Sequence, residues 1–168
     1  LLMGNWDYDD AEWQLIPTEN IYALWTNEGE RGTPAMTWDV AGPGSDRSVV
    51  MVWDGLTLTH VYTLDDEDIN RQARQVDYFS KLHKVPRNRI VVDATGIGTG
   101  PSQFLRGCYA FNGGDAPKLN KDFRNFKSEC SFGLADYVND GRFGIATDTA
   151  RDEIARELTF LRQWRGEA

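Results

Sequence analysis

The stretch AMTWDVAGPGSDRSVVMVWDGLTLTHVYTL, residues 35–64, decides the fold of this chain. Apolar and polar residues alternate along much of it, which is the pattern of strands with one buried face. It predicts strands at 35–41, 48–53 and 56–64, with Asp54-Gly55 as a typical hairpin turn between the last two. Three consecutive antiparallel strands therefore begin the sheet.

A helix and a fourth strand follow these three strands. The acidic run at 65–68 is suited to a helix N-terminus, and apolar residues at helical spacing extend that helix from Ile69 to Leu82. Pro86 ends the helix. The β-branched run at 89–93 is typical of a strand buried on both faces, and its position after a helix predicts parallel pairing.

The remaining segments predict further helices and short strands. Residues 1–32 are aromatic and acidic, contain a helix at 19–26, and are expected to be a lead-in segment outside the core. The other expected elements are a helix at 101–108, a strand at 109–111, a long helix ending near Gly141, a strand at 143–146 and a helix from Asp148. The predicted fold class is α/β, with a mixed sheet of three antiparallel strands followed by parallel strands, flanked by helices.

Length and composition predict one globular domain. The chain has 168 residues, of which 40% are apolar and 26% charged, enough for one buried core. No run of about 18 apolar residues appears, and the acidic start lacks the basic region of a signal peptide, so no membrane contact is expected. Cys108 and Cys130 have neither CxxC spacing nor a histidine partner, and are expected to be buried, reduced thiols.

The charge distribution limits where nucleic acid can bind. A net charge of −8 excludes nonspecific binding over the whole surface, because contacts to phosphate need Lys or Arg. One stretch has the opposite sign: from residue 118 to 127, four basic residues and one acid give 4 − 1 = +3. The candidate DNA contacts are Lys118, Lys121, Arg124 and Lys127, although a solvated helix entrance explains these charges equally well.

Two aspartates mark a candidate metal site. Asp39 and Asp93 each lie where a strand ends and a glycine-rich loop begins. If the fourth strand pairs beside the first, both carboxylates meet at one edge of the sheet and repel each other unless a cation lies between them. Mg²⁺ and Mn²⁺ accept such ligands, and two ions there would activate water for attack on a phosphodiester. Asp46, on the loop after the first strand, is either a third carboxylate or a loop cap.

These residues resemble the C-terminal nuclease half of the large terminase subunit of tailed bacteriophages. The resemblance covers nearly all of the chain. It lies in Gly4-Asn5-Trp6, in Asp39-Val40-Ala41 with Gly44, Asp46 and Ser48, in Val92-Asp93 with Gly96 and Gly98, and in residues 123–141 with Asn125, Phe126, Lys127 and Glu129. The sequence contains no Gly-x-x-x-x-Gly-Lys-Ser/Thr phosphate loop, the mark of the ATPase domain that precedes this nuclease in the family.

The resemblance implies an RNase H-like fold and a divalent-metal endonuclease that cuts concatemeric double-stranded DNA as it is packaged into a capsid. Asp39 and Asp93 match the family's first two metal ligands, with Mg²⁺ or Mn²⁺ as cofactor. The implied partners are double-stranded DNA, the small terminase subunit and the portal of the procapsid, in the cytoplasm of a bacterial host.

The resemblance also implies a division of the chain. Residues 1–32 would be the link from the ATPase domain, and residues 33–168 the nuclease domain. The family's third acidic ligand has no equivalent before Ala168, so the metal site is expected to be incomplete within these residues.

Three other functions account for parts of the pattern. Residues 91–100 resemble the first motif of S-adenosylmethionine methyltransferases, with an acid-to-glycine spacing one residue longer. The Asp, Gly and Ser residues of the first hairpin resemble phosphate-binding ATPases of the actin and sugar-kinase type, which have a second similar domain. A noncatalytic module for DNA docking or assembly, with purely structural acids, is the third alternative.

Overall fold

The fold is taken from a computed structural model, which describes residues 14–41, 47–93, 103 and 105–162. Within these residues, no helix is long and apolar enough to cross a membrane. The elements in chain order are α1 (Thr18–Ala23), β1 (Pro34–Asp39), β2 (Ser48–Asp54), β3 (Thr57–Leu64), α2 (Ile69–Leu82), the 3-10 turn η2 (Arg87–Arg89), β4 (Ile90–Asp93), β5 (Tyr109–Phe111), α3 (Phe126–Asn139), β6 (Gly144–Ile145) and α4 (Arg151–Thr159).

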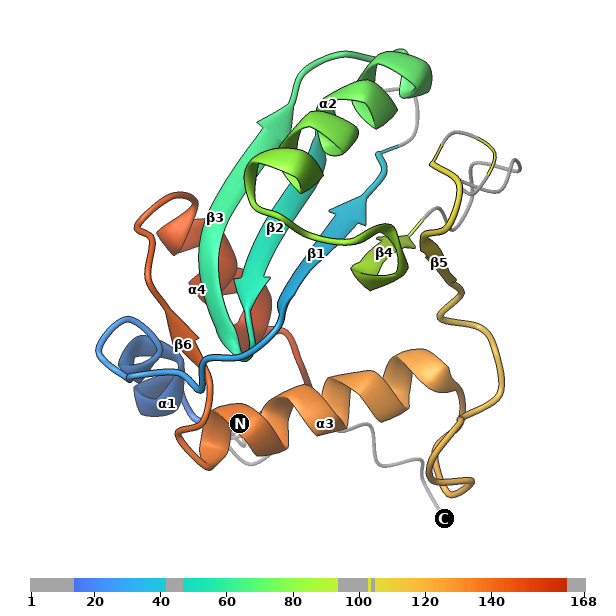
Figure 1. Ribbon diagram of the computed structural model, residues 1–168. Coiled ribbons are helices and arrows are strands. Elements are labelled where there is room, and N and C mark those ends of the chain that lie inside the picture. Colours follow the sequence, from blue (N-terminus) through green and yellow to red (C-terminus); the bar gives the residue numbers. More distant parts are fainter. Residues whose placement is uncertain (1–13, 42–46, 94–102, 104, 163–168) are drawn as a thin grey trace, which may run out of the picture.

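The strands form one mixed sheet in the order β5-β4-β1-β2-β3-β6 (Figure 1). β1, β2 and β3 pair antiparallel, as the alternation in the sequence predicts. β4 runs parallel to β1, β5 runs parallel to β4, and β6 runs parallel to β3 at the opposite edge. The predicted mixed sheet is confirmed. Its antiparallel half also differs from the parallel βα units of doubly wound folds, which disfavours the methyltransferase alternative.

The turn between β2 and β3 depends on a glycine. Gly55 has a φ of +61°, a backbone conformation that side chains rarely adopt. A Cβ there would lie 2.5 Å from the carbonyl oxygen of Glu30. That carbonyl accepts a hydrogen bond from the N–H of Leu56 at 2.7 Å, so the hairpin is joined directly to the segment before β1.

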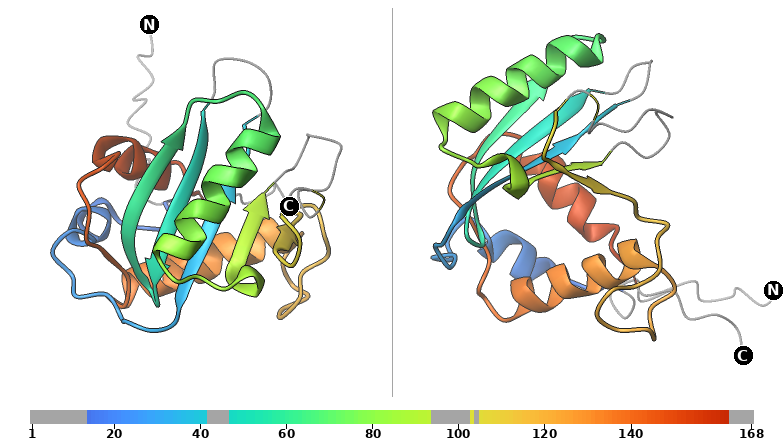
Figure 2. Two further views of the ribbon diagram at one scale, coloured as in Figure 1. Left: turned by 45° about the horizontal axis from the view of Figure 1, so that its top comes forward. Right: turned by 45° about the vertical axis from the view of Figure 1, so that its right-hand side comes forward.

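Helix α2 covers one face of the sheet (Figure 2). The Asp68 carboxylate caps it by accepting from the N–H of Asn70 at 2.8 Å, which confirms the predicted role of the acidic run. Alternate strand residues pack beneath the helix and are 4% exposed or less. This first core includes Met36, Trp38, Val50, Val52, Ile90 and Val92 from the sheet, with Ala73 and Val76 from α2.

Helices α1, α3 and α4 lie on the other face, where a second core forms (Figure 2). Ile16, Ile21 and Leu24 are at most 1% exposed in this core. The expectation that residues 1–32 lie outside the core is therefore wrong for the described part of that segment. The reason is long-range packing, because α1 contacts both α3 and α4.

Two predicted helices differ from the structure. The last helix begins at Arg151 and not at Asp148, because Asp148 lies in the preceding turn, where its carbonyl oxygen accepts the N–H of Arg151 at 3.2 Å. Its carboxylate pairs with the Arg151 guanidinium at 3.1 Å. The helix expected at 101–108 falls largely outside the described residues, and residues 105–108 form a turn.

Candidate functional site

The ends of β1 and β4 bring two carboxylates together. Asp39 and Asp93 are the last residues of these neighbouring parallel strands and are register partners. The N–H of Val40 donates to the carbonyl oxygen of Asp93 at 3.0 Å, which joins the two strand ends. Because residues in register project from the same face of a sheet, the two side chains emerge side by side. The predicted juxtaposition is therefore present, while the catalytic role of the pair stays a prediction.

Strand alternation separates this site from the first core. Trp38 and Val92 point toward α2 and are fully buried. Their neighbours Asp39 and Asp93 point to the opposite face, where α3 lies. A shift of one residue in either strand would exchange a core side chain for a carboxylate, so the register of β1 against β4 fixes the site.

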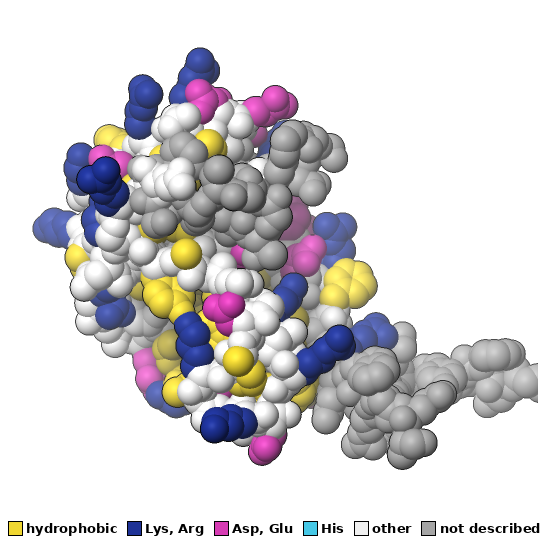
Figure 3. All heavy atoms as spheres, turned by 90° about the vertical axis from the view of Figure 1, so that its right-hand side faces the viewer, with side chains coloured by type: hydrophobic (Ala, Val, Ile, Leu, Met, Phe, Trp, Pro, Cys, Tyr) yellow, Lys and Arg dark blue, Asp and Glu magenta, His cyan; other side chains and the backbone are white. Residues whose placement is uncertain are grey.

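A cleft of about 420 Å³ opens beside the carboxylates, between the strands and the first turns of α3. Apart from the two acids, its walls are mostly apolar, and Figure 3 shows this side of the molecule with apolar side chains in the middle and Lys and Arg side chains around them. The cleft wall includes Thr37 on β1, Tyr109 and Phe111 on β5, and Phe126 and Cys130 on α3.

The charge on Asp39 is disfavoured by its surroundings. Partial burial raises the pKa of the Asp39 carboxyl, the negative charge of Asp93 raises it further, and the positive charge of Lys127 lowers it in part. The side chain is nevertheless exposed at the cleft mouth, so solvent screening limits the size of this shift. Two like charges held together in this way are the arrangement that a cation relieves.

The donor set fits a hard divalent cation, although it is small. Asp39 and Asp93 offer carboxylate oxygens at adjacent strand ends, and oxygen is the ligand that Mg²⁺ and Mn²⁺ prefer. Among the described residues, no group of three or more Asp, Glu, His or Cys side chains is close enough to hold a metal. Asp46 and the glycine-rich segment 94–102 lie outside the described residues.

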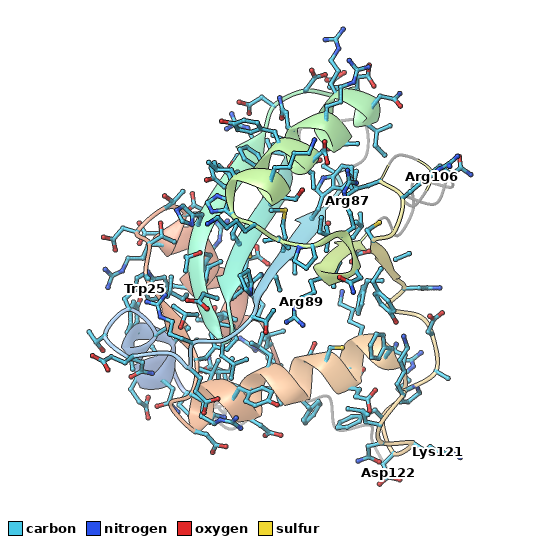
Figure 4. The ribbon with its side chains drawn as sticks, in the orientation of Figure 1. Trp25, Arg87, Arg89, Arg106, Lys121 and Asp122 are labelled. Atoms are coloured by element: carbon cyan, nitrogen blue, oxygen red, sulfur yellow. The ribbon has the colours of Figure 1, made fainter. Side chains whose placement is uncertain are left out.

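The four candidate DNA contacts divide into two pairs. The Lys118 ammonium lies 4.6 Å from the Tyr109 ring centre and 4.3 Å from the Phe126 ring centre, so it adjoins the cleft wall. Lys127 acts electrostatically on Asp39. Lys121 and Arg124 are exposed on the loop between β5 and α3, and Figure 4 shows Lys121 pointing away from the sheet at the tip of that loop.

The residue-based predictions named Lys127 on α3 but gave no role in the cleft wall to Phe126 and Cys130. Cys130 was expected to be buried, but it is an exposed free thiol in the cleft wall. It lies one helical turn after Phe126, and this i, i+4 spacing is the signal that places both on one helix face. No local sequence pattern places Phe126 or Cys130 near the two aspartates, because α3 is brought to the site by packing between segments that are distant in the sequence.

Comparison with solved structures identifies the class of fold. The chain has the RNase H-like fold, in the form found in nuclease domains of phage large terminase subunits. It is similar to the nuclease domain of the large terminase subunit gp2 of bacterial virus Sf6, with a TM-score of 0.73 and 16% identity over 87% of this chain and 81% of that one. A point mutant of that domain, solved with manganese and beta-thujaplicinol, gives a TM-score of 0.74 at the same identity and coverage.

A second terminase nuclease supports the same fold. The large terminase nuclease from thermophilic phage G20c matches with a TM-score of 0.57 and 18% identity over 85% of this chain and 80% of that one. No protein-family model matches the sequence, and no curated protein matches it significantly. At these identities the comparisons establish the fold, and they confirm at that level the resemblance to terminase nucleases found in the sequence.

Proposed function

We propose that this chain is the nuclease domain of a phage large terminase subunit and cuts double-stranded DNA with the help of divalent metal. The observation that carries the proposal is the pairing of Asp39 with Asp93 at the ends of two parallel strands, facing an open cleft. The fold shared with terminase nucleases supports it. In the virus, the substrate would be concatemeric DNA, and the partners would be the small terminase subunit and the portal of the procapsid.

Asp39 and Asp93 would hold the metal, as Mn²⁺ or Mg²⁺. Support comes from their oxygen donors, from the raised pKa of Asp39, and from the related domain solved with manganese. A divalent ion in such a site neutralises charge on the phosphate and lowers the pKa of bound water. Asp46 is a further candidate ligand by its position in the sequence alone.

The other residues of the site would bind and orient DNA. Lys127, whose positive charge already acts on Asp39, is suited to a phosphate next to the scissile bond. The ring of Tyr109 and the ring of Phe126, which flank Lys118, offer flat apolar surface for a sugar or an unstacked base. The mostly apolar walls would exclude water from the phosphate as the DNA enters and so strengthen these charge interactions.

Plasmid nicking by the purified chain in Mn²⁺ tests the proposal. Asp39→Asn and Asp93→Asn keep the shape of each side chain and remove its charge, and each should reduce the nicking rate about 100-fold or more, equivalent to about 2.7 kcal/mol. Asp136→Asn is the matched control, because Asp136 is an exposed acid on α3 that does not line the cleft. Its rate should equal that of the unmodified chain.

Two results would count against a metal nuclease. One is nicking by both strand-end variants at the rate of the Asp136→Asn control, which would assign the activity to a contaminant or to another site. The other is no nicking by the folded chain in either Mn²⁺ or Mg²⁺, which would favour a docking module.

A further inference from the structure

The loop between β5 and α3, residues 112–125, presents an apolar side chain to solvent. Leu119 is 93% exposed, more than any other large hydrophobic residue in the described chain. Such exposure in a loop would be unremarkable if the backbone around it were loose. Here the backbone is fixed, which makes the placement of the side chain a property of the fold.

One buried carboxylate fixes that backbone. Glu129, on the first turn of α3, is only 7% exposed and accepts three consecutive N–H groups, from Lys118 at 2.7 Å, Leu119 at 2.8 Å and Asn120 at 2.6 Å. Burial alone would raise the pKa of Glu129, but the three hydrogen bonds outweigh it and the pKa is lowered. The carboxylate therefore stays charged and holds the loop where it presents Leu119.

The loop is continuous with the cleft. The residue that precedes Leu119 is Lys118, whose ammonium lies over two rings of the cleft wall, Tyr109 and Phe126. The other end of the loop is anchored as well, since the N–H of Phe126 donates to the carbonyl oxygen of Asp115 at 2.7 Å. Leu119 therefore directly follows, along the chain, a residue whose side chain contacts the cleft wall.

The basic residues beside Leu119 are not neutralised. Lys121 and Arg124 are exposed, and neither lies within 4.0 Å of a carboxylate in the described part of the chain. On the α2 side, by contrast, Arg71 pairs with Asp66 and Lys81 pairs with Asp77. In a chain of net charge −8, cations without a carboxylate partner among the described residues favour a polyanion as the ligand of this loop over a neutral protein surface.

We propose that the β5–α3 loop binds duplex DNA beside the cleft, with Leu119 inserted into a groove and Lys121 and Arg124 on the flanking phosphates. The proposal rests on the nuclease function above and adds a second contact that positions the duplex. Leucine wedges flanked by basic residues suit this task, because an apolar side chain can enter the minor groove between partly unstacked base steps while the cations contact the phosphates on either side. Glu129 is a positioning residue in this arrangement, since it acts through the backbone of the loop.

Fluorescence anisotropy of a short labelled duplex, in EDTA so that no cutting occurs, tests the proposal. Leu119→Ser should weaken binding about 10-fold and leave the salt dependence unchanged, because it removes apolar contact and no charge. Lys121→Ala should weaken binding and reduce the slope of log K against log salt by about 1. The matched controls are Leu82→Ser, a 54% exposed leucine on α2, and Arg74→Ala, an exposed cation on α2, and both should bind like the unmodified chain.

Glu129→Ala separates loop positioning from simple electrostatics. Removing an acid should strengthen DNA binding if only net charge matters, whereas loss of the fixed loop should weaken it several-fold. Asp122→Ala makes the same change of charge at an exposed position of the same loop, and it should bind at least as tightly as the unmodified chain. If Glu129→Ala lowers the melting temperature strongly, the exposed Leu119→Ser change, which touches no core residue, decides the question.

The outcomes separate the two proposals. Equal affinity of Leu119→Ser and Leu82→Ser for DNA overturns the groove contact and would assign Leu119 to a protein partner, whatever the nicking assay shows. Nicking that survives loss of both strand-end carboxylates overturns the nuclease proposal, even if the loop binds DNA as expected.

Discussion

The two faces of the sheet differ, although they are formed by the same strands. On the α2 face, Trp38 and its neighbours are buried under a helix in the first core. On the α3 face, the next residue, Asp39, stands at the mouth of a cleft beside Asp93, and part of the sheet is left uncovered. Both faces contain a hydrophobic core, but only the α3 face also places a carboxylate, Asp39, beside a like charge at an open cleft, which indicates that this part of the α3 face is built for a ligand.

The surroundings of the charged side chains also differ between the α2 side and the cleft. Beside α2, Asp77 pairs with both Lys81 and Arg87. Around the cleft, Asp39 has a like charge as its neighbour, and Lys121 on the adjoining loop has no carboxylate partner in the described chain. The Asp77 carboxylate is thus compensated within the fold, whereas the charge of Asp39 is opposed by its neighbour.

The largest loss of stability should come from creating a cavity in the first core, on the α2 face. Trp38→Ala should lower the free energy of unfolding by about 3–5 kcal/mol, because it removes a fully buried side chain from the first core. Thr37→Ala, one residue away on the open face, should cost about 1 kcal/mol, since it removes the acceptor of the Trp53 indole N–H. Urea unfolding measures both, and equal losses would contradict the division into a sealed face and an open face.

The second-largest effect should be the stabilisation of the folded chain by Mn²⁺ bound at the cleft on the α3 face. Mn²⁺ at about 100 times its dissociation constant should raise the free energy of unfolding by about 2.7 kcal/mol, because only the folded chain holds Asp39 and Asp93 together. Thermal melts with and without Mn²⁺ measure the change. Asp39→Asn should lose most of this response and Asp136→Asn should keep it, so an equal response in the two variants would place the metal elsewhere.

The pH dependence should have opposite signs on the two faces. The pKa of Asp39 is raised above its unfolded value, so its contribution to stability falls as the pH rises through that window and stays unfavourable at neutral pH. Asp39→Asn should therefore be more stable than the unmodified chain at pH 7 without metal, by less than about 1 kcal/mol given its exposure, and should lose the advantage below the unfolded value of 3.8.

Asp77→Asn is the matched change on the closed face. The hydrogen bond from Lys81 and the charge of Arg87 lower the pKa of Asp77, so its stabilisation is present at neutral pH and lost as the pH falls. This variant should be less stable than the unmodified chain at pH 7, by about 1 kcal/mol or less, and should approach it in acid. The same sign for both variants in melts from pH 3.5 to 7 would be inconsistent with the charge asymmetry.

The smallest effect should come from single surface cations. Lys81→Ala breaks an i, i+4 ion pair of 2.8 Å on α2 and should cost about 0.3–0.5 kcal/mol of unfolding free energy. Lys121→Ala should leave stability unchanged, because no described carboxylate lies within 4.0 Å of it. A stability loss at Lys121 as large as at Lys81 would show that its charge is used within the fold.

Much of the sheet could be predicted from the sequence because its signals are local. Alternation fixed the strands of residues 34–64, and Gly55 marked their hairpin. The acidic run before α2 predicted its cap at Asp68. The helix between β3 and β4 also predicted parallel pairing, because a crossover connection returns the chain in the same direction. The meeting of Asp39 and Asp93 was predicted only for the case that the fourth strand lies beside the first, and the structure shows that it does.

The rest of the site depended on contacts between distant segments. Ile16 and Ile21 were not predicted to be buried, since their partners on α3 and α4 lie more than a hundred residues away. The cleft wall formed by Tyr109 and Cys130 has no common motif, and the three hydrogen bonds of Glu129 join a helix to a loop whose conformation no propensity specifies. These features result from packing between distant segments, so local sequence patterns do not predict them.

The sequence by itself determined two carboxylates at strand ends, the order of the elements and the basic stretch from Lys118 to Lys127. These are set by side-chain chemistry and by the periodicity of a strand, both of which act over a few residues. Only the tertiary structure decided that the carboxylates open onto a partly uncovered face, and that Glu129 holds Leu119 out beside it. Those outcomes depend on which helix covers which part of the sheet. The placement of the helices is set by the apolar surface that the whole chain buries, which no short segment determines.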